Sequence, residues 1–197
     1  MKRMLWLLTG MGVVGVAAGG WWWYERETVP PPLHLEPIWP LVEAYPITDM
    51  TGGPPPNLRG KVVLLNFIYT RCPSVCPRLQ SQIRLVLQQI PPTPALVAVS
   101  ISLDPEHDTP EYLRAYAKSY EVPGHTWLFW RPANQAWAIQ LAASVFGLRA
   151  ARLSETEILH SDVILLIDSE GRLRGWYAST DDRLLKHTQN LLRLCER

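Results

Sequence analysis

The pattern of apolar and polar positions divides the chain into three parts. Residues 5–24 form an apolar run without a charged side chain, and nine of the 18 prolines then fall between residues 25 and 59. From Gly60 onward the apolar positions recur with the spacings of strands and helices. These changes predict an N-terminal segment (1–24), a Pro-rich linker (25–44) and a folded domain (45–197).

The domain alternates between strand-like and helix-like segments. Continuous β-prone apolar runs predict buried strands at 61–69, 95–101 and 163–167, and a turn at 168–171 leads into a further strand at 173–177. Helical spacing and capping residues predict helices at 77–90, 110–120, 134–146 and 181–194, with Thr109 as the N-cap of the second. This order is typical of an α/β domain, and it fits a thioredoxin-like fold, which is a mixed sheet flanked by helices.

The N-terminal segment has the length and the flanks of a transmembrane helix. Its apolar run matches the roughly 20 residues that span a bilayer, and four aromatic residues at 21–24 suit the membrane–water boundary. Lys2 and Arg3 stay cytoplasmic under the positive-inside rule. A cleaved signal peptide is the competing interpretation, because Ala17-Ala18-Gly19 offers a cleavage site. Both interpretations place the domain outside the cytoplasm, and the first predicts a single-pass protein of the bacterial cytoplasmic membrane with the Pro-rich linker as a spacer.

Composition excludes several classes of protein. The chain is 47% hydrophobic and 19% charged, which is unlike a disordered chain. Its 19 basic and 18 acidic side chains give no general electrostatic reason to bind nucleic acid. Three cysteines are too few for a small domain stapled by disulfides, so their role depends on where they lie.

Two of the cysteines, Cys72 and Cys76, directly follow the first buried strand. Active sites of α/β folds lie at this position, between a strand and the helix that follows it. We place Pro77 at the first helical position, which makes Cys76 the predicted N-cap and its thiol the one with a lowered pKa. Two thiols at this spacing can share a metal ion or close a disulfide, and the alternative is a plain stabilising disulfide or two buried thiols without a further role. The three intervening residues differ from the two of thioredoxin-type oxidoreductases.

His160 is the candidate for a third ligand, although a structural role fits its position equally well. It lies just before the strand at 163–167, and in a thioredoxin-like sheet the loop that enters this strand faces the cysteine turn. Two thiolates and one imidazole are too few for a typical four-ligand zinc site, but they suffice for cuprous copper. The other four histidines are interpreted as structural or surface residues: His34, His107, His125 and His187.

Together these motifs resemble the Sco/SenC family of copper-binding cytochrome c oxidase assembly proteins. The resemblance rests on the cysteine motif with its two prolines, on Asp104-Pro105-Glu106-His107-Asp108-Thr109 and on His160-Ser161. It implies that Cys72, Cys76 and His160 bind copper, as Cu(I) or Cu(II). It also implies a role in building the CuA centre of the oxidase, by copper delivery or by reduction of the CuA cysteines. The implied partners are the CuA-containing subunit and, as a second candidate, another copper chaperone.

Three features depart from the family pattern. Ser74 stands between the cysteines where an acidic residue is common. Leu159 precedes the histidine where Asp is frequent, and the acidic side chain follows it instead, as Asp162. The segment 147–159 is short and lacks the usual acidic stretch. The three ligands are present, so these departures bear on metal affinity, redox potential and the partner surface.

Two other functions use the same residues. A membrane-tethered thiol–disulfide oxidoreductase would use Cys72 and Cys76 as its dithiol, but residues 161–163 lack the proline that thioredoxin-like enzymes usually place there. A copper or redox sensor would need a signalling partner. The protein is therefore interpreted primarily as a metallochaperone. Residues 104–109 are predicted to form a turn and helix cap near the cysteine loop, and Cys195 is interpreted as an incidental thiol.

Overall fold

The centre of the sheet consists of parallel strands whose residues are apolar on both sides. The computed structural model describes residues 30–33 and 35–195. In it β2 (Val62–Ile68) and β3 (Leu96–Ser102) are buried at every position and pair in parallel. β4 (Thr126–Pro132) continues the parallel part on the other side of β3. Continuous apolar runs of this kind are expected of strands that helices cover on both faces.

Antiparallel strands complete the sheet on both edges. β7 (Ile164–Ile167) pairs with β2, β8 (Leu173–Tyr177) pairs with β7, and β1 (Ile47–Asp49) pairs with β4. The strand order is β1-β4-β3-β2-β7-β8. A separate two-stranded hairpin consists of β5 (Ala150–Arg152) and β6 (Ile158–His160). The predicted α/β class, with parallel strands and a late antiparallel hairpin, is confirmed.

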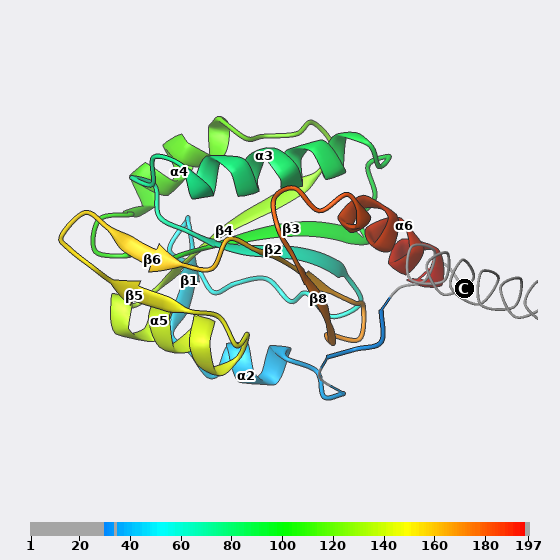
Figure 1. The fold of residues 1–197 in the computed structure, drawn as a ribbon, viewed down its shortest axis with the longest axis horizontal. Coiled ribbons are helices and arrows are strands. Elements are labelled where there is room, and N and C mark those ends of the chain that lie inside the picture. The colour runs from blue at the N-terminus through cyan, green and yellow to red at the C-terminus, as the bar shows by residue number, and fades with distance from the viewer. Residues whose placement is uncertain (1–29, 34, 196–197) are drawn as a thin grey trace, which may run out of the picture.

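Helices cover both faces of the sheet (Figure 1). These helices are α2 (Trp39–Glu43), α3 (Val75–Gln88), α4 (Pro110–Lys118), α5 (Gln135–Ser144) and α6 (Arg183–Cys195). The helices α3 and α6, near the top and right of the view, pack on one face, and α5 and α2 lie below the sheet. Arg84 of α3 donates to the carbonyl of Ser119, the C-cap of α4, at 3.5 Å, so α4 lies beside α3.

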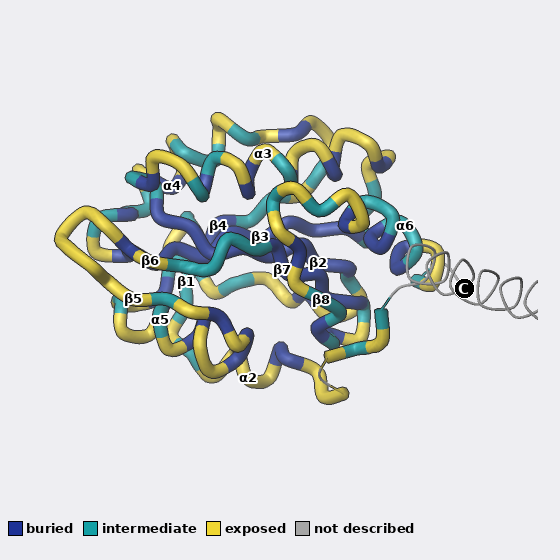
Figure 2. Tube along the Cα trace, in the orientation of Figure 1, coloured by how far each residue is buried: buried dark blue, intermediate teal, exposed yellow. Residues whose placement is uncertain are grey.

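Successive residues of β2 contribute to two different cores, because side chains alternate across a strand. Val62 and Leu64 belong to the core under α3 and α6, whereas Val63 and Leu65 belong to the core that includes α2 and α5. Figure 2 shows the result, with buried strands between helices whose outer sides are exposed.

The helices α4 and α5 begin at the predicted residues, with Thr109 and Asn134 as their N-caps. The Thr109 side chain accepts a hydrogen bond from the Tyr112 backbone N–H at 3.4 Å, and Asn134 accepts one from Trp137 at 2.9 Å. Each satisfies one of the N–H groups that the first turn of a helix leaves unpaired.

The chain before residue 45 differs from the predicted extended linker. Residues 39–43 form the short helix α2, in which Trp39 and Val42 are buried. The N–H of Ile38 donates to the Gly171 carbonyl at 2.9 Å, and Gly171 has φ +82°, so a Cβ there would lie 2.7 Å from the Trp39 ring. Pro40 falls in the first turn of α2, where a proline needs no N–H acceptor. Proline density therefore did not exclude a helix, and this part of the segment packs against the domain.

The predicted membrane anchor, residues 1–24, lies outside the described residues. Within residues 30–33 and 35–195, no helix is both long and apolar enough to cross a bilayer. The described chain begins beside β8, where the Leu33 N–H donates to the Leu173 carbonyl at 2.7 Å.

Candidate metal centre

The turn between β2 and α3 carries both cysteines. The N-cap of α3 is Ser74, and Val75 and Cys76 already belong to its first turn. The prediction that Cys76 is the N-cap is therefore wrong. Pro77 takes the third helical position, where its missing N–H would have had no intrahelical acceptor, so the helix can begin two residues before the proline.

The two thiols lie against each other and are both buried, with exposed fractions of 7% for Cys72 and 0% for Cys76. Both are free thiols. The Cys76 backbone N–H, in the first turn of α3, donates to Cys72 Sγ at 3.4 Å. The sulfur of Cys72 thus accepts from a helix N-terminus, where backbone N–H groups favour negative charge.

The two cysteines consequently differ in protonation. A hydrogen bond from the Cys76 thiol, with further ones from backbone N–H groups, lowers the pKa of Cys72 to about 3 in spite of its burial. Burial raises the pKa of Cys76 far above its ordinary range, and the neighbouring Cys72 sulfur raises it further. The pair therefore holds one thiolate, on Cys72, and one thiol, on Cys76. The prediction had placed the lowered pKa on Cys76, and it is wrong because Cys76 lies deeper in the core.

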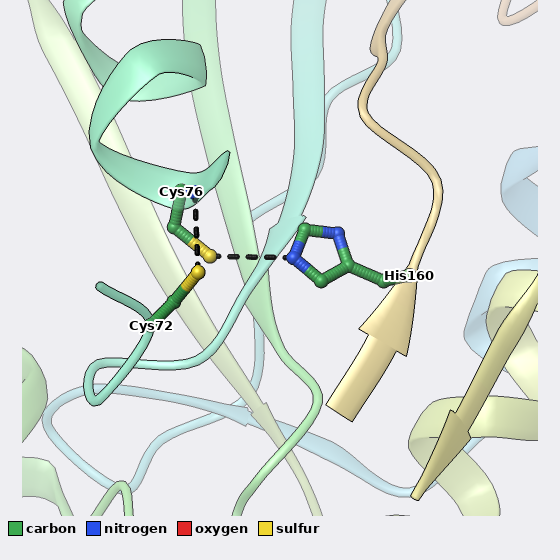
Figure 3. Close-up of side chains that lie close together, drawn as sticks. All are labelled: Cys72, Cys76 and His160. Carbon is green, nitrogen blue, oxygen red and sulfur yellow. Dashed lines mark hydrogen bonds between the residues drawn. The ribbon is translucent and has the colours of Figure 1, made fainter. Parts of the chain in front are cut away.

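His160 lies beside the cysteine pair, at the end of β6 (Figure 3). Its Nε2 is 3.4 Å from Cys76 Sγ, and its Nδ1 is 3.1 Å from the Ser161 carbonyl oxygen. Because a carbonyl oxygen can only accept, Nδ1 carries the ring hydrogen and Nε2 presents its lone pair to the thiols. An imidazole in this tautomer and orientation can bind a metal ion through Nε2.

The three donor atoms fit one metal ion. The two sulfurs and Nε2 all lie within 4.8 Å of one another. Bonds of roughly 2.0–2.3 Å from a soft ion to nitrogen and sulfur place the donors of a three-coordinate site roughly 3.5–4 Å apart. Only a small contraction is therefore needed. Within residues 35–195, the possible metal ligands of this cluster are Cys72, Cys76 and His160. Two thiolates and an imidazole are typical ligands of soft metal ions.

Tyr69, at the end of β2, is a neighbour of the site that sequence reasoning missed. Its ring meets the His160 ring edge-on, with centroids 5.8 Å apart. Burial, followed by a hydrogen bond to Cys72, raises the pKa of Tyr69 to about 12, so its hydroxyl stays protonated and can donate to the thiolate. The sequence offered only its position three residues before Cys72 as a signal.

The predicted turn at residues 104–109 packs next to the cysteine loop, as expected. Asp108 is buried, and its carboxylate accepts from the hydroxyls of Thr70 and Ser102, each at 2.6 Å. The Thr70 backbone N–H also donates to Asp108, at 3.2 Å. These bonds fix the chain just before Cys72. Although Asp104, His107 and Asp108 lie within reach of one another, hydrogen-bond donors of the protein occupy both carboxylates.

The remaining candidates lie away from the cysteine pair or have structural partners. His107 stacks on Tyr112 with ring centroids 4.8 Å apart. His187 is buried, with Nδ1 2.7 Å from the Tyr177 hydroxyl. His125 precedes β4, Cys195 ends α6, and His34 falls outside the described residues.

The residues Leu159 and Asp162, which together form one departure from the family pattern, lie on the surface beside His160. Asp162 is 39% exposed and accepts from Arg78 at 3.2 Å, and Leu159 is half exposed on the hairpin. Ser74 caps α3 without a side-chain hydrogen bond and is exposed. None of these three residues displaces a donor atom of the cluster.

Comparison with known proteins gives consistent matches. The SCO1/SenC family model matches residues 41–193. A protein of Stutzerimonas stutzeri named for copper binding is 31% identical over 125 residues, which cover 60% of this chain and 59% of that protein. The chain spans about three fifths to two thirds of the length of the curated relatives that it matches first.

Solved structures match over most of the domain. Bradyrhizobium japonicum ScoI with copper bound has a TM-score of 0.63 at 26% identity, covering 76% of this chain and 96% of that one. BsSco, described as a member of the Sco family of cytochrome c oxidase assembly proteins with a disulfide switch, has a TM-score of 0.66 at 21% identity, covering 84% and 98%. At that identity the second match supports the fold alone. The sheet with its flanking helices matches the Sco fold, as predicted, and the transmembrane helix stays a prediction.

Proposed function

The chain belongs to the SCO1/SenC family, and we propose that it is a copper-binding protein of cytochrome c oxidase assembly whose ligands are Cys72, Cys76 and His160. The proposal depends on one observation, the presence of two thiols and a bare imidazole nitrogen within 4.8 Å of one another. Three soft donors suffice for Cu(I), whereas structural zinc takes four ligands. The copper-bound ScoI structure and the relative named for copper binding support this choice of metal.

Copper is the cargo in this proposal, and the protonation of the cysteines sets how it is held. The Cys72 thiolate is ready to bind, Cys76 binds after losing its proton, and His160 adds its neutral Nε2. His160 is the most accessible of the three ligands. An incoming ligand from an acceptor protein would therefore displace His160 first and the two buried thiolates afterwards.

We place the domain outside the cytoplasm, tethered to the bacterial cytoplasmic membrane by residues 1–24, with the CuA-containing oxidase subunit as the acceptor. The uncharged run at residues 5–24, behind Lys2 and Arg3, supports the anchor. Membership of the SCO1/SenC family, whose resemblance implies a role in building the CuA centre, supports the acceptor.

Copper titration of the full-length protein in detergent tests the ligand assignment. We expect one copper per chain and a strong thiolate-to-Cu(II) absorption band, and His160→Ala should weaken Cu(II) binding and alter that band. His125→Ala is the matched control, because His125 precedes β4 at the opposite end of the sheet. A His160→Ala protein with unchanged affinity and spectrum would show that the assignment is wrong. Mixing the Cu(I)-loaded protein with the apo CuA domain then shows whether metal moves.

The unequal protonation of the cysteines also favours a second function, reduction of the CuA cysteines. A thiolate paired with a buried thiol is the arrangement with which a dithiol attacks a disulfide. The Cys72 thiolate would attack a disulfide sulfur of the target and form a mixed disulfide. Cys76, after losing its proton, would then attack Cys72 Sγ, so that the target receives two electrons and Cys72–Cys76 becomes a disulfide. If the reduced protein leaves oxidised CuA domain unchanged, this function is excluded.

A further inference from the structure

We propose that Asp104 is a positioning residue of the metal centre, because it clamps the hairpin that carries His160 to the loop that carries Cys72. The inference rests on the proposed function only in taking His160 as a ligand. Asp104 itself touches none of the three donor atoms, so it would act through the two arginines that it binds.

The hairpin β5–β6 needs such a clamp because it stands apart from the main sheet. It forms its own two-stranded sheet, and among the residues of its two strands only Ile158 is buried. His160 and Cys76 are separated by 84 positions in the chain. The chain from His160 into β7, which pairs with β2, fixes one end of the hairpin, and contacts between the hairpin and the cysteine loop must fix the rest.

Asp104 makes those contacts from a buried position, with an exposed fraction of 1%. One carboxylate oxygen accepts from Arg71, and the other accepts from Arg152 Nη2 at 2.6 Å. Arg71 immediately precedes Cys72. Arg152 belongs to β5 and pairs with Ile158, two residues before His160. One carboxylate thus joins both ligand-bearing segments.

Both arginines also donate to the same backbone oxygen at the tip of the hairpin. The Glu155 carbonyl accepts from Arg71 at 3.1 Å and from Arg152 at 2.8 Å. Ser102, at the end of β3, fixes the clamp to the sheet by accepting the Asp104 N–H at 3.0 Å. Charge-assisted bonds to a buried carboxylate are stronger and more directional than neutral ones. Replacing Asp104 should therefore loosen the hairpin as a unit.

Replacing Asp104 should displace one metal ligand only, His160. Cys72 and Cys76 lie on the cysteine turn, which Asp108 fixes independently through Thr70. A metal ligand must be held within about 0.5 Å of its productive position. A loosened hairpin should therefore weaken the His160 bond to copper and leave the two thiolate bonds intact.

The test uses Asp104→Asn, which keeps the shape of the side chain and removes its charge. Asp168→Asn is the matched control, since Asp168 is also buried, 3% exposed, and accepts from Arg172 and Arg174 in the β7–β8 hairpin. In the copper-free full-length protein, we expect the amides of residues 150–160 to exchange hydrogen about tenfold faster in Asp104→Asn. The control should leave their exchange unchanged. After Cu(II) loading, Asp104→Asn should lose nitrogen hyperfine coupling and keep a thiolate absorption band that is altered as in His160→Ala.

Arg152→Gln provides the second variant, and it decides the question if Asp104→Asn fails to fold. Unchanged exchange at residues 150–160 together with unchanged nitrogen coupling would refute the clamp. The clamp would also be refuted if Asp104→Asn lost as much stability as Asp168→Asn but changed neither the exchange at residues 150–160 nor the nitrogen coupling. The exchange measurement needs no copper, so failure of the wild-type protein to bind copper would remove the proposed function without affecting this result.

Discussion

The protonation of the cysteine pair determines how many protons copper binding releases. Cys72 is a thiolate, because its pKa is lowered to about 3, and Cys76 is a thiol, because burial raises its pKa. Near neutral pH, binding one Cu(I) ion should therefore release one proton, which comes from Cys76. Since the metal competes with that proton, the apparent association constant should rise with pH, by about tenfold per unit. Two ordinary thiols would release about two protons and give about a hundredfold rise per unit below their usual pKa near 8.5.

The apparent association constant for Cu(I) is measured by competition with a Cu(I) chelator, using the full-length protein. The pH range is about 7 to about 8, where ordinary imidazoles are mostly uncharged. A pH indicator in weak buffer counts the released protons directly. Cys76→Ser should bind more weakly and lose both the proton release and the pH dependence. Release of two protons would show that Cys72 is not a thiolate, and release of none would show that Cys76 is already ionised. Either result would refute the reasoning from burial and hydrogen bonding.

Three further predictions concern stability and are measured by urea unfolding. Gly171→Ala should destabilise the domain by about 1–3 kcal/mol, because a Cβ at φ +82° would lie 2.7 Å from the Trp39 ring; unchanged stability would contradict the packing of α2. Gln80→Leu should cost about 1–3 kcal/mol, because it leaves the buried Asn66 side-chain N–H without its acceptor and removes one of the donors to the Ser100 hydroxyl, whereas Gln88→Leu, exposed on the same helix, should stay within about 0.5 kcal/mol. Asn134→Ala should cost about 1 kcal/mol through loss of the cap on Trp137, and Asn134→Ser should recover most of it.

The sequence by itself determined the elements whose stability is local. β2 and β3 are apolar at nearly every position, and such runs form strands buried on both faces. Thr109 and Asn134 begin their helices because a side-chain oxygen within three residues satisfies a free N–H. The spacing of Cys72 and Cys76 places both thiols in one turn without any long-range contact.

Local signals were insufficient at two positions. The prolines before residue 45 predicted an extended chain, yet Trp39 and Val42 gain more from burial against the domain than Pro40 costs in a first turn. Pro77 was placed at the start of α3, although a proline is tolerated anywhere in the first turn, and the helix begins at Val75.

Only the tertiary structure decided how the site works. Which strands pair is set by the surfaces that meet when the chain packs, and this brings His160 to Cys76 across 84 residues. The depth of burial is likewise a property of the whole fold, so only the packed domain could assign the thiolate to Cys72 and the thiol to Cys76. The same is true of Asp104, which in the sequence is one acidic residue of a turn. Packing places its carboxylate between Arg71 and Arg152, where a single buried charge can hold two distant segments together.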